Sequence, residues 1–482
     1  MQTDKLYKLY QHKANNKWLV LGVLLAVFFG WLIAVNGISI ATFFVLLPFI
    51  ICYLILVIIK PRIGLISFII YCFLMPTLGK HISGIQFGLG QDALLILTWL
   101  GVIFYRSDRY RLRHLNNDLV WLAVVWFVIT LLQLANTNMP SIEGWLYEMR
   151  SATLYWILTV PLAIMLFNKK KDLDLFFFII IAFSLIGSLY GIKQLIFGVD
   201  KGEMQWLLDG AIKTHMLFGK LRVFSYYSDA AQFGASQAHI AIVCFILAFG
   251  PYSVQKKMLF VFVGMVIFYG MIISGTRGAL FGLIIGGVVF LILSKKLKIL
   301  LIGSILGIGI LGILKFTSIG NSNAKLARFR TSLDFRDPSL QVRFINQRVL
   351  SNYLSDKPFG TGVGTIGMWG VKYNPDKFIS KIPPDSLFVK IWAMYGIVGF
   401  IIWFGMMVYI VGKSSGIIWK TRDPLLKNKL LALCSGATGM LMCSFGNEVL
   451  NTMPSACIVY ISWAFVWLSP RWDTPIVKSI QS

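Results

Sequence analysis

The feature that most constrains this chain is a succession of long apolar runs, each about as long as a membrane is thick. Fourteen runs are candidate spans, and at about 1.5 Å per residue most reach the roughly 30 Å of the hydrocarbon core. They lie near residues 18–35, 38–59, 63–78, 89–105, 119–135, 151–167, 173–197, 230–249, 258–274, 277–294, 297–316, 385–412, 428–446 and 452–468. Because the runs are continuous rather than short and alternating, the sequence predicts an all-α polytopic membrane protein with about fourteen transmembrane helices.

The composition excludes several other classes of protein. Of 482 residues, 57% are hydrophobic and 13% are charged, whereas soluble domains carry about 25% charged residues. This argues against a cytosolic enzyme, a disordered chain and a disulfide scaffold. The six cysteines lie inside apolar runs and form no CxxC pair, and the five histidines show no HExxH spacing. We therefore expect no metal site. The sequence also contains no phosphate-binding motif that would indicate a nucleotide cofactor.

Charge gives the predicted topology. The net charge is +25, and basic residues gather in every second connection between the spans and near both termini. The basic segments are 5–17, 60–62, 106–113, 169–171, 256–257, 295–298, 413–429 and 471–478. Because basic residues concentrate in cytoplasmic loops, these segments are predicted to be cytoplasmic, with both termini inside and the first helix uncleaved. This distribution accounts for the charge without a nucleic-acid partner.

Two of the predicted outer connections are long, 198–229 and 317–383. The second carries ten Lys and Arg against four Asp, a net charge of +6 on the side where no basic excess is expected. A long solvated loop and a surface for an anionic ligand both explain this excess. We divide the chain into N-terminal helices at 1–197, a core at 198–412 that includes both loops, and C-terminal helices at 413–482.

Two arginines lie where spans meet the predicted outer surface. Arg277 belongs to the sequence SGTRG at 274–278, which joins two spans with almost no loop, and Arg222 precedes another span. An arginine at this depth either reaches lipid phosphate or binds a ligand pyrophosphate, which a guanidinium grips with two hydrogen bonds.

Two carboxylates occupy similar positions. Asp385 stands at the outer start of a span after two prolines, where a helix N-cap and a catalytic role are both open. Glu448 lies in a short outer turn and is a second candidate, the alternative being a solvated interfacial acid. Lys193 and Lys390 fall within spans close to the outer ends, where each side chain is expected to reach toward water.

Four stretches resemble the O-antigen ligase and polysaccharide polymerase (Wzy-type) superfamily of bacterial membrane proteins. Residues 272–280 resemble an S-R-G-A hairpin. Residues 348–364 resemble a loop with an Arg, a "dhP" and a "GvGxg" element, and residues 384–400 resemble an "HNxyL…GliG" segment. The stretch that begins at Arg222 resembles an "RvxGxf" element. Together they cover residues 222 to about 405, and their order and spacing carry the resemblance.

The resemblance implies a fold related to the metal-independent membrane glycosyltransferases (GT-C-like). It implies a donor glycan linked to undecaprenyl pyrophosphate, used on the outer face of the bacterial inner membrane. It also implies that Arg222 and Arg277 bind the pyrophosphate. Arg343 and Arg348 are predicted to close over it from the loop, and Asp385, or else Glu448, to accept the proton of the attacking hydroxyl.

Ligases of the family carry His where this chain has Pro384. This difference favours a polymerase of O-antigen, capsule or exopolysaccharide, whose acceptor is another lipid-linked repeat unit. The alternatives are an O-antigen-type ligase that transfers the glycan to lipid A core or protein, and a transporter of lipid-linked sugars. The expected partners are the lipid-linked oligosaccharide and membrane lipid, with a chain-length regulator left open.

Overall fold

The structure, a computed structural model, describes residues 2–36, 38–82, 84–104, 115–138, 141–217, 219–295, 334 and 336–473, with single residues between 301 and 330. Its helices are α1 (Gln2–Asn36), α2 (Ile38–Ile59), α3 (Pro61–His81), α4 (Gly88–Phe104), α5 (Asp118–Leu132), α6 (Ile142–Met149), α7 (Tyr155–Leu166), α8 (Lys170–Phe197), α9 (Lys201–Trp206), α10 (Ile212–His215), α11 (Ala230–Ala248), α12 (Val254–Ser274), α13 (Arg277–Ser294), α16 (Pro338–Leu354), α17 (Gly367–Tyr373), α18 (Leu387–Lys420), α19 (Pro424–Cys443) and α20 (Ser455–Leu468). A two-residue antiparallel pair, β1 (Met216–Leu217) and β2 (Lys220–Leu221), forms a small hairpin.

The chain is an all-α polytopic membrane protein. Within the described residues, eight helices are long and apolar enough to cross a membrane, and three shorter apolar helices accompany them. Every predicted span coincides with a helix except 297–316, most of which lies outside the described residues. The total of fourteen crossings therefore stays a prediction.

The structure differs from the predicted boundaries at α6 and α7. A π-helical segment, η3 (Arg150–Leu154), joins these helices into one element, Ile142–Leu166, whereas the hydropathy predicted a span that begins at 151. The charged side chain of Glu148 lowers the hydropathy of this segment. In the structure, however, this side chain is fully buried and ion-paired.

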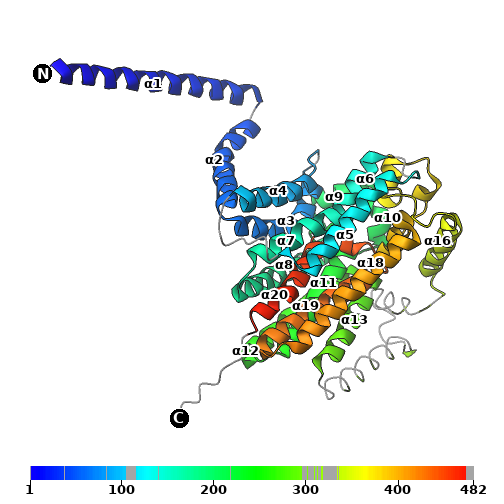
Figure 1. Cartoon of the computed structure of the whole chain (residues 1–482). Coiled ribbons are helices and arrows are strands. Elements are labelled where there is room, and N and C mark those ends of the chain that lie inside the picture. The colour runs from blue at the N-terminus through cyan, green and yellow to red at the C-terminus, as the bar shows by residue number, and fades with distance from the viewer. Residues whose placement is uncertain are drawn as a thin grey trace, which may run out of the picture.

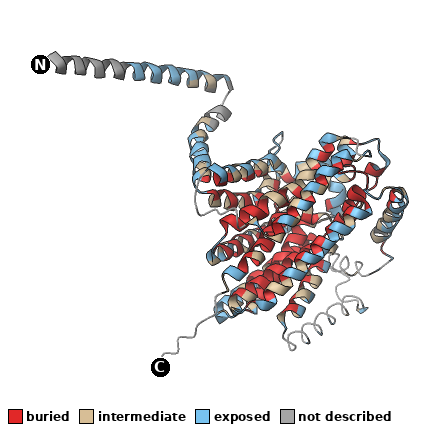
Figure 2. Cartoon of the chain, in the orientation of Figure 1, coloured by how far each residue is buried: buried red, intermediate tan, exposed pale blue. Residues whose placement is uncertain are grey.

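The helices pack around α11, which lies at the centre of the bundle. In its apolar window 89% of the residues are buried, the largest share among the eight long helices, and α11 contacts α8, α12, α13 and α19. Figure 2 shows the buried residues concentrated on these central helices, while α1 leads away from the bundle and α16 lies at its edge (Figure 1).

Ion pairs join the predicted cytoplasmic connections. Arg62 pairs with Asp172, Lys170 with Asp423, Lys429 with Asp174, and Lys413 with Asp118. These residues come from connections that are distant in the sequence, so the fold brings the basic connections to one end of the bundle. The described parts of the two long loops and the candidate site residues lie at the opposite end.

Glycines allow α13 and α19 to approach closely, as their spacing of four residues predicts. A Cβ atom on Gly282 would lie 2.8 Å from the carbonyl oxygen of Gly439, and one on Gly286 would lie 2.9 Å from that of Ser435. Since backbone atoms cannot yield as side chains can, a larger residue here would push the helices apart.

We expect Gly282→Ala to destabilise the protein by about 1–3 kcal/mol, the usual cost of overpacking a tight contact. Gly287→Ala is the matched control, since a Cβ atom there would lie 3.7 Å from its nearest neighbour, Ile242. Thermal unfolding of both variants in detergent measures the difference. Equal unfolding temperatures would contradict the close packing of α13 on α19.

Candidate active site

Arg222 lies on a loop that is fastened to α3 and α8. Asp200 caps α9, and its carboxylate accepts a hydrogen bond from the backbone N–H of Glu203 (3.0 Å). The amide of Gln194 on α8 donates to Glu203 (2.6 Å) and accepts from the backbone N–H of Ser225 (2.8 Å). Three residues after Arg222, the chain is therefore tied to α8.

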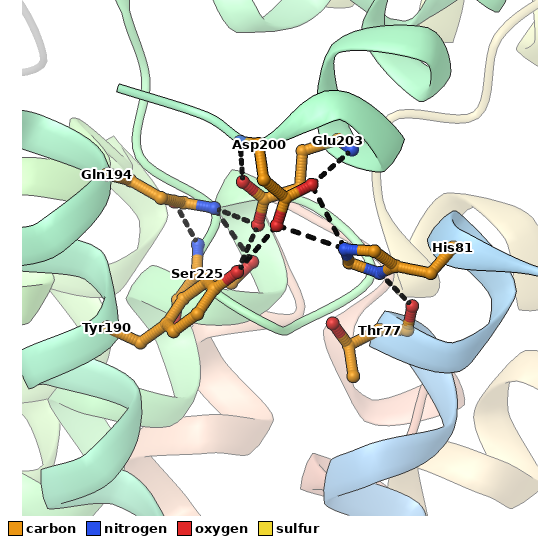
Figure 3. A network of polar contacts seen from close by, with 7 residues as sticks. All are labelled: Thr77, His81, Tyr190, Gln194, Asp200, Glu203 and Ser225. Atoms are coloured by element: carbon orange, nitrogen blue, oxygen red, sulfur yellow. Dashed lines mark hydrogen bonds and ion pairs between the residues drawn. The ribbon is translucent and has the colours of Figure 1, made fainter. Parts of the chain in front are cut away.

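A histidine and a tyrosine complete this network, which Figure 3 shows from close by. The ring of His81, at the end of α3, lies 3.0 Å from both carboxylate oxygens of Asp200. The hydroxyl of Tyr190 donates to Glu203 (2.9 Å) and to Asp200 (3.1 Å). These contacts hold the loop in one place, so the position of Arg222 is set by the bundle.

The guanidinium of Arg222 contacts the residue before Arg277. It donates to the carbonyl of Thr214 (3.0 Å) and to the hydroxyl of Thr276 (3.4 Å), the residue before Arg277. Burial and the nearby charge of Arg277 lower the pKa of Arg222, while Asp229 opposes this shift. Arg222 Nε is buried and has no hydrogen-bond partner among the described residues. The arginine pair thus offers positive charge and an unsatisfied donor.

Arg277 is the first residue of α13, where the helix dipole adds positive charge. The preceding turn is docked on α11, because the hydroxyl of Thr276 donates to the carbonyl of Ala230 (2.7 Å). The sequence left open whether Arg277 reaches lipid phosphate. In the structure its guanidinium pairs with Asp337 (2.7 Å), which directly precedes α16. This pair connects Arg277 to the helix that carries Arg343.

An open pocket of about 480 Å³ lies at the same end of the bundle. Its charged lining comes from three separate segments: Arg343 on α16, Lys381 and Asp385 before α18, and Glu448 after α19. The other lining residues are Gly367, Met368, Val371, Ser380, Ile382, Pro383, Pro384 and Asn447. The pocket therefore combines both signs of charge with an apolar wall.

The turn at 444–448 connects the pocket to the arginine pair. A Cβ atom on Gly278, the residue after Arg277, would lie 2.5 Å from the amide nitrogen of Asn447. A Cβ atom on Gly446 would lie 3.7 Å from both Arg343 Nη1 and Gly278 Cα. The start of α13, the turn and Arg343 are thus close neighbours, and the pocket and the arginines form one continuous region.

Asp385 is held in an unusual backbone conformation at the rim of the pocket. Its φ of 52° is in the left-handed region that favours glycine. The N-cap of α18 is Ser386 and not Asp385, so the capping interpretation is wrong. Burial raises the pKa of the Asp385 carboxyl and Glu448 adds to this shift, while the Arg343 cation opposes it.

Glu448 is paired with a lysine that the sequence did not single out as a site residue. Lys390 donates to Glu448 (2.8 Å) and forms a second ion pair with Glu148 (2.9 Å). The side chain of Lys390 is 6% exposed and that of Glu148 is 0% exposed, while that of Glu448 is 29% exposed. Lys390 therefore does not reach toward water as expected, and Glu448 is not a merely solvated acid.

The geometry can be compared with known proteins. Residues 260–404 match the family model described as O-antigen ligase. This match supports the predicted relationship to the O-antigen ligase/Wzy-type superfamily. It supports an O-antigen ligase/polymerase-type membrane enzyme of glycosyltransferase-like character. No curated protein matches the chain.

The matched part of the chain contains Arg277, Arg343 and Asp385, whereas Arg222 and Glu448 lie outside it. The structure brings these five candidate residues to one region. Arg348, the sixth, is exposed on α16 and does not line the pocket. It lies five residues beyond Arg343, on another face of the same helix.

The glycine-rich loop at 360–364 is hydrogen-bonded to α18. The backbone N–H groups of Thr361 and Gly362 donate to the carbonyls of Ala393 and Met394 (3.0 Å each). These carbonyls precede Gly396, where α18 breaks with a φ of 69°. The motif thus fixes the segment that carries Asp385 and Lys390, which accounts for glycines there without a nucleotide.

Two residues of the site, Lys390 and Glu148, were missed by sequence reasoning. A lysine inside an apolar helix needs an acidic partner, and this was the available signal. The sequence offered no means of choosing the partner, because Glu148, Lys390 and Glu448 lie on elements far apart in the chain.

Proposed function

We propose that this enzyme polymerises a surface polysaccharide by joining repeat units linked to undecaprenyl pyrophosphate. One observation carries the proposal: Arg222 contacts the residue before Arg277, and the residue after Arg277 approaches Asn447 in the wall of a pocket that holds Arg343, Asp385 and Glu448. Paired guanidinium groups suit a pyrophosphate, and carboxylates beside them suit the hydroxyl groups of a sugar.

The chemistry is a single displacement at the anomeric carbon of the donor. The acceptor hydroxyl oxygen bonds to this carbon, and Asp385 accepts the hydroxyl proton. The bond from the anomeric carbon to the pyrophosphate oxygen breaks, and undecaprenyl pyrophosphate leaves with the electron pair. Arg222, Arg277 and Arg343 stabilise the negative charge that develops on the leaving group. Because attack and departure occur on opposite sides, the anomeric configuration inverts.

Pro384 favours a polymerase over a ligase. The ligases that the third motif resembles carry His at this position, whereas the pocket here has Pro384 and Asp385 in its wall. A base that is shorter than His suits an acceptor hydroxyl that comes close to the rim. The acceptor would then be a second lipid-linked repeat unit.

The proposed location follows from charge. The ion-paired basic connections lie at the cytoplasmic end, so both termini are inside and the pocket faces outward from the inner membrane. The predicted division into N-terminal helices, core and C-terminal helices remains part of this proposal. Both the donor and the growing chain would stay anchored in membrane lipid.

A gel assay with purified protein tests the proposal. The substrate is undecaprenyl-pyrophosphate repeat units from the host's own polysaccharide cluster, and EDTA is present. We expect a ladder of products that differ by one repeat unit. Intact substrate without a ladder would contradict the polymerase. Transfer to a lipid A core or protein acceptor in place of the ladder would identify a ligase.

A further inference from the structure

Lys390 forms two ion pairs, and one of them is with Glu448, which lines the pocket. Its ammonium group lies 2.8 Å from Glu448 Oε2 and 2.9 Å from Glu148 Oε2. Lys390 is on α18, Glu148 is on α6, and Glu448 is in the turn after α19. Three elements that are distant in the sequence therefore meet at one cation.

Lys390 has more acidic partners than its charge requires. One carboxylate would be sufficient to balance a buried lysine, and here the carboxyl groups of two glutamates flank it. Burying an extra charge is costly unless it serves a partner. Glu148 is fully buried, so Glu448, at 29% exposed, is the member that presents this charge to the pocket.

The two carboxylate oxygens of Glu448 have different surroundings. Its Oε2 is held by Lys390, while Oε1 lies near Gly367, where a Cβ atom would be 3.8 Å away. Gly367 has a φ of 76° and lines the pocket without a side chain. One oxygen is thus fixed from behind, and the other is left as a hydrogen-bond acceptor.

We propose that Glu448 forms a subsite that binds hydroxyl groups of the acceptor sugar, and that Lys390 and Glu148 are positioning residues for it. Asp385, on the adjoining segment of the pocket lining, remains the base. The inference rests on the proposed function, since it assigns a part of the same substrate to one wall of the same pocket. A carboxylate that accepts hydrogen bonds from hydroxyl groups is the usual means of binding a sugar tightly in water.

A double-mutant cycle tests whether Lys390 acts through Glu448. We expect Glu448→Gln to lower the elongation rate about 10- to 100-fold, the effect of losing one charge-assisted hydrogen bond. Lys390→Met should lower it similarly, and the double variant should lose no more than the worse single variant. Lys390→Arg should restore part of the rate. Losses that multiply in the double variant would overturn the positioning role.

Lys390→Met leaves the buried carboxylate of Glu148 and the partly exposed one of Glu448 without this partner, and the variant can fail to fold. The variant Glu148→Gln/Lys390→Met removes the buried pair as a whole and leaves Glu448 in place. We expect it to unfold at a temperature close to that of the wild type and still to lose activity as Glu448→Gln does. A wild-type rate in this folded variant would overturn the inference.

Lys429 offers a matched control at the opposite end of the bundle. Its side chain is also 6% exposed and pairs with a carboxylate, that of Asp174. We expect Lys429→Met to elongate within about twofold of the wild type, since it lies outside the pocket. An equal loss in Lys429→Met and Lys390→Met would assign the effect to general destabilisation.

Acceptors that each lack one hydroxyl identify the bound group directly. For at least one such acceptor, the wild type should lose about 10- to 100-fold in rate and Glu448→Gln should lose nothing further. Equal losses in both proteins for every acceptor would overturn the subsite. If the wild type makes no ladder with the natural substrate, the proposed function fails. A wild-type ladder with unaffected Lys390 variants overturns this inference alone.

Discussion

Replacing Arg277 by alanine is expected to lower the rate of elongation about 10²- to 10³-fold, the usual effect of removing one preorganised group that stabilises a developing negative charge. Arg277 stands at the positive end of α13, beside Arg222. The substitution removes a charge where the leaving pyrophosphate is proposed to bind. Arg277→Lys should recover only part of the rate, because an ammonium group cannot make the paired hydrogen bonds of a guanidinium.

Arg62→Ala is the control for this prediction. Arg62 also pairs with a buried carboxylate, that of Asp172, at the opposite end of the bundle. Single-turnover rates measured for both variants with the same lipid-linked repeat unit separate loss of an ion pair from loss of the site. If Arg277→Ala elongates at the wild-type rate, or if both variants lose the same factor, the assignment of Arg277 is wrong.

Replacing Asp385 by asparagine is expected to lower the rate about 10²- to 10⁴-fold, the range of a lost general base. The amide has nearly the shape of the carboxylate but cannot accept the proton of the acceptor hydroxyl. The measurement is the initial rate of ladder formation at saturating substrate, with circular dichroism to show that the variant is folded. Wild-type activity in Asp385→Asn would move the role of the base to another residue.

The pH dependence of the wild type follows from the same carboxylate. The base acts when it is ionised, and burial raises the pKa of Asp385. As the pH is lowered, activity should therefore begin to fall at a pH higher than that at which an ordinary aspartate titrates. The Arg343 cation lowers this pKa. Arg343→Ala should therefore raise it further and move the acidic limb of the rate profile to higher pH. A limb that stays in place, or one that moves to lower pH, would contradict this arrangement.

Much of the fold follows from the order of apolar and basic segments. Span positions were predictable because helices inside a membrane satisfy their own backbone and must be apolar over their length. The α6–α7 element shows the limit of this rule. Its hydropathy is interrupted by Glu148, whose charge is compensated by Lys390, a residue more than two hundred positions away.

The candidate site could be predicted in part for the same reason. Arg222, Arg277 and Asp385 were recognisable because each stands at the end of a span, and alternation of the spans places these ends together. The support behind Glu448 depends on side-chain contacts among α6, α18 and the turn after α19. Arg348 and Arg343 lie on one helix, and only the orientation of α16 decides which one reaches the pocket.

The proposed mechanism requires that the bond between the anomeric carbon and the pyrophosphate breaks at this site. The decisive measurement is the ratio of undecaprenyl pyrophosphate released to glycosidic bonds formed by purified protein, with EDTA present. We expect one molecule released for each bond formed, and both products from Arg277→Ala at a rate about 10²- to 10³-fold lower. Lipid-linked units that move across a proteoliposome membrane intact, with no pyrophosphate released, would contradict the account and identify a transporter.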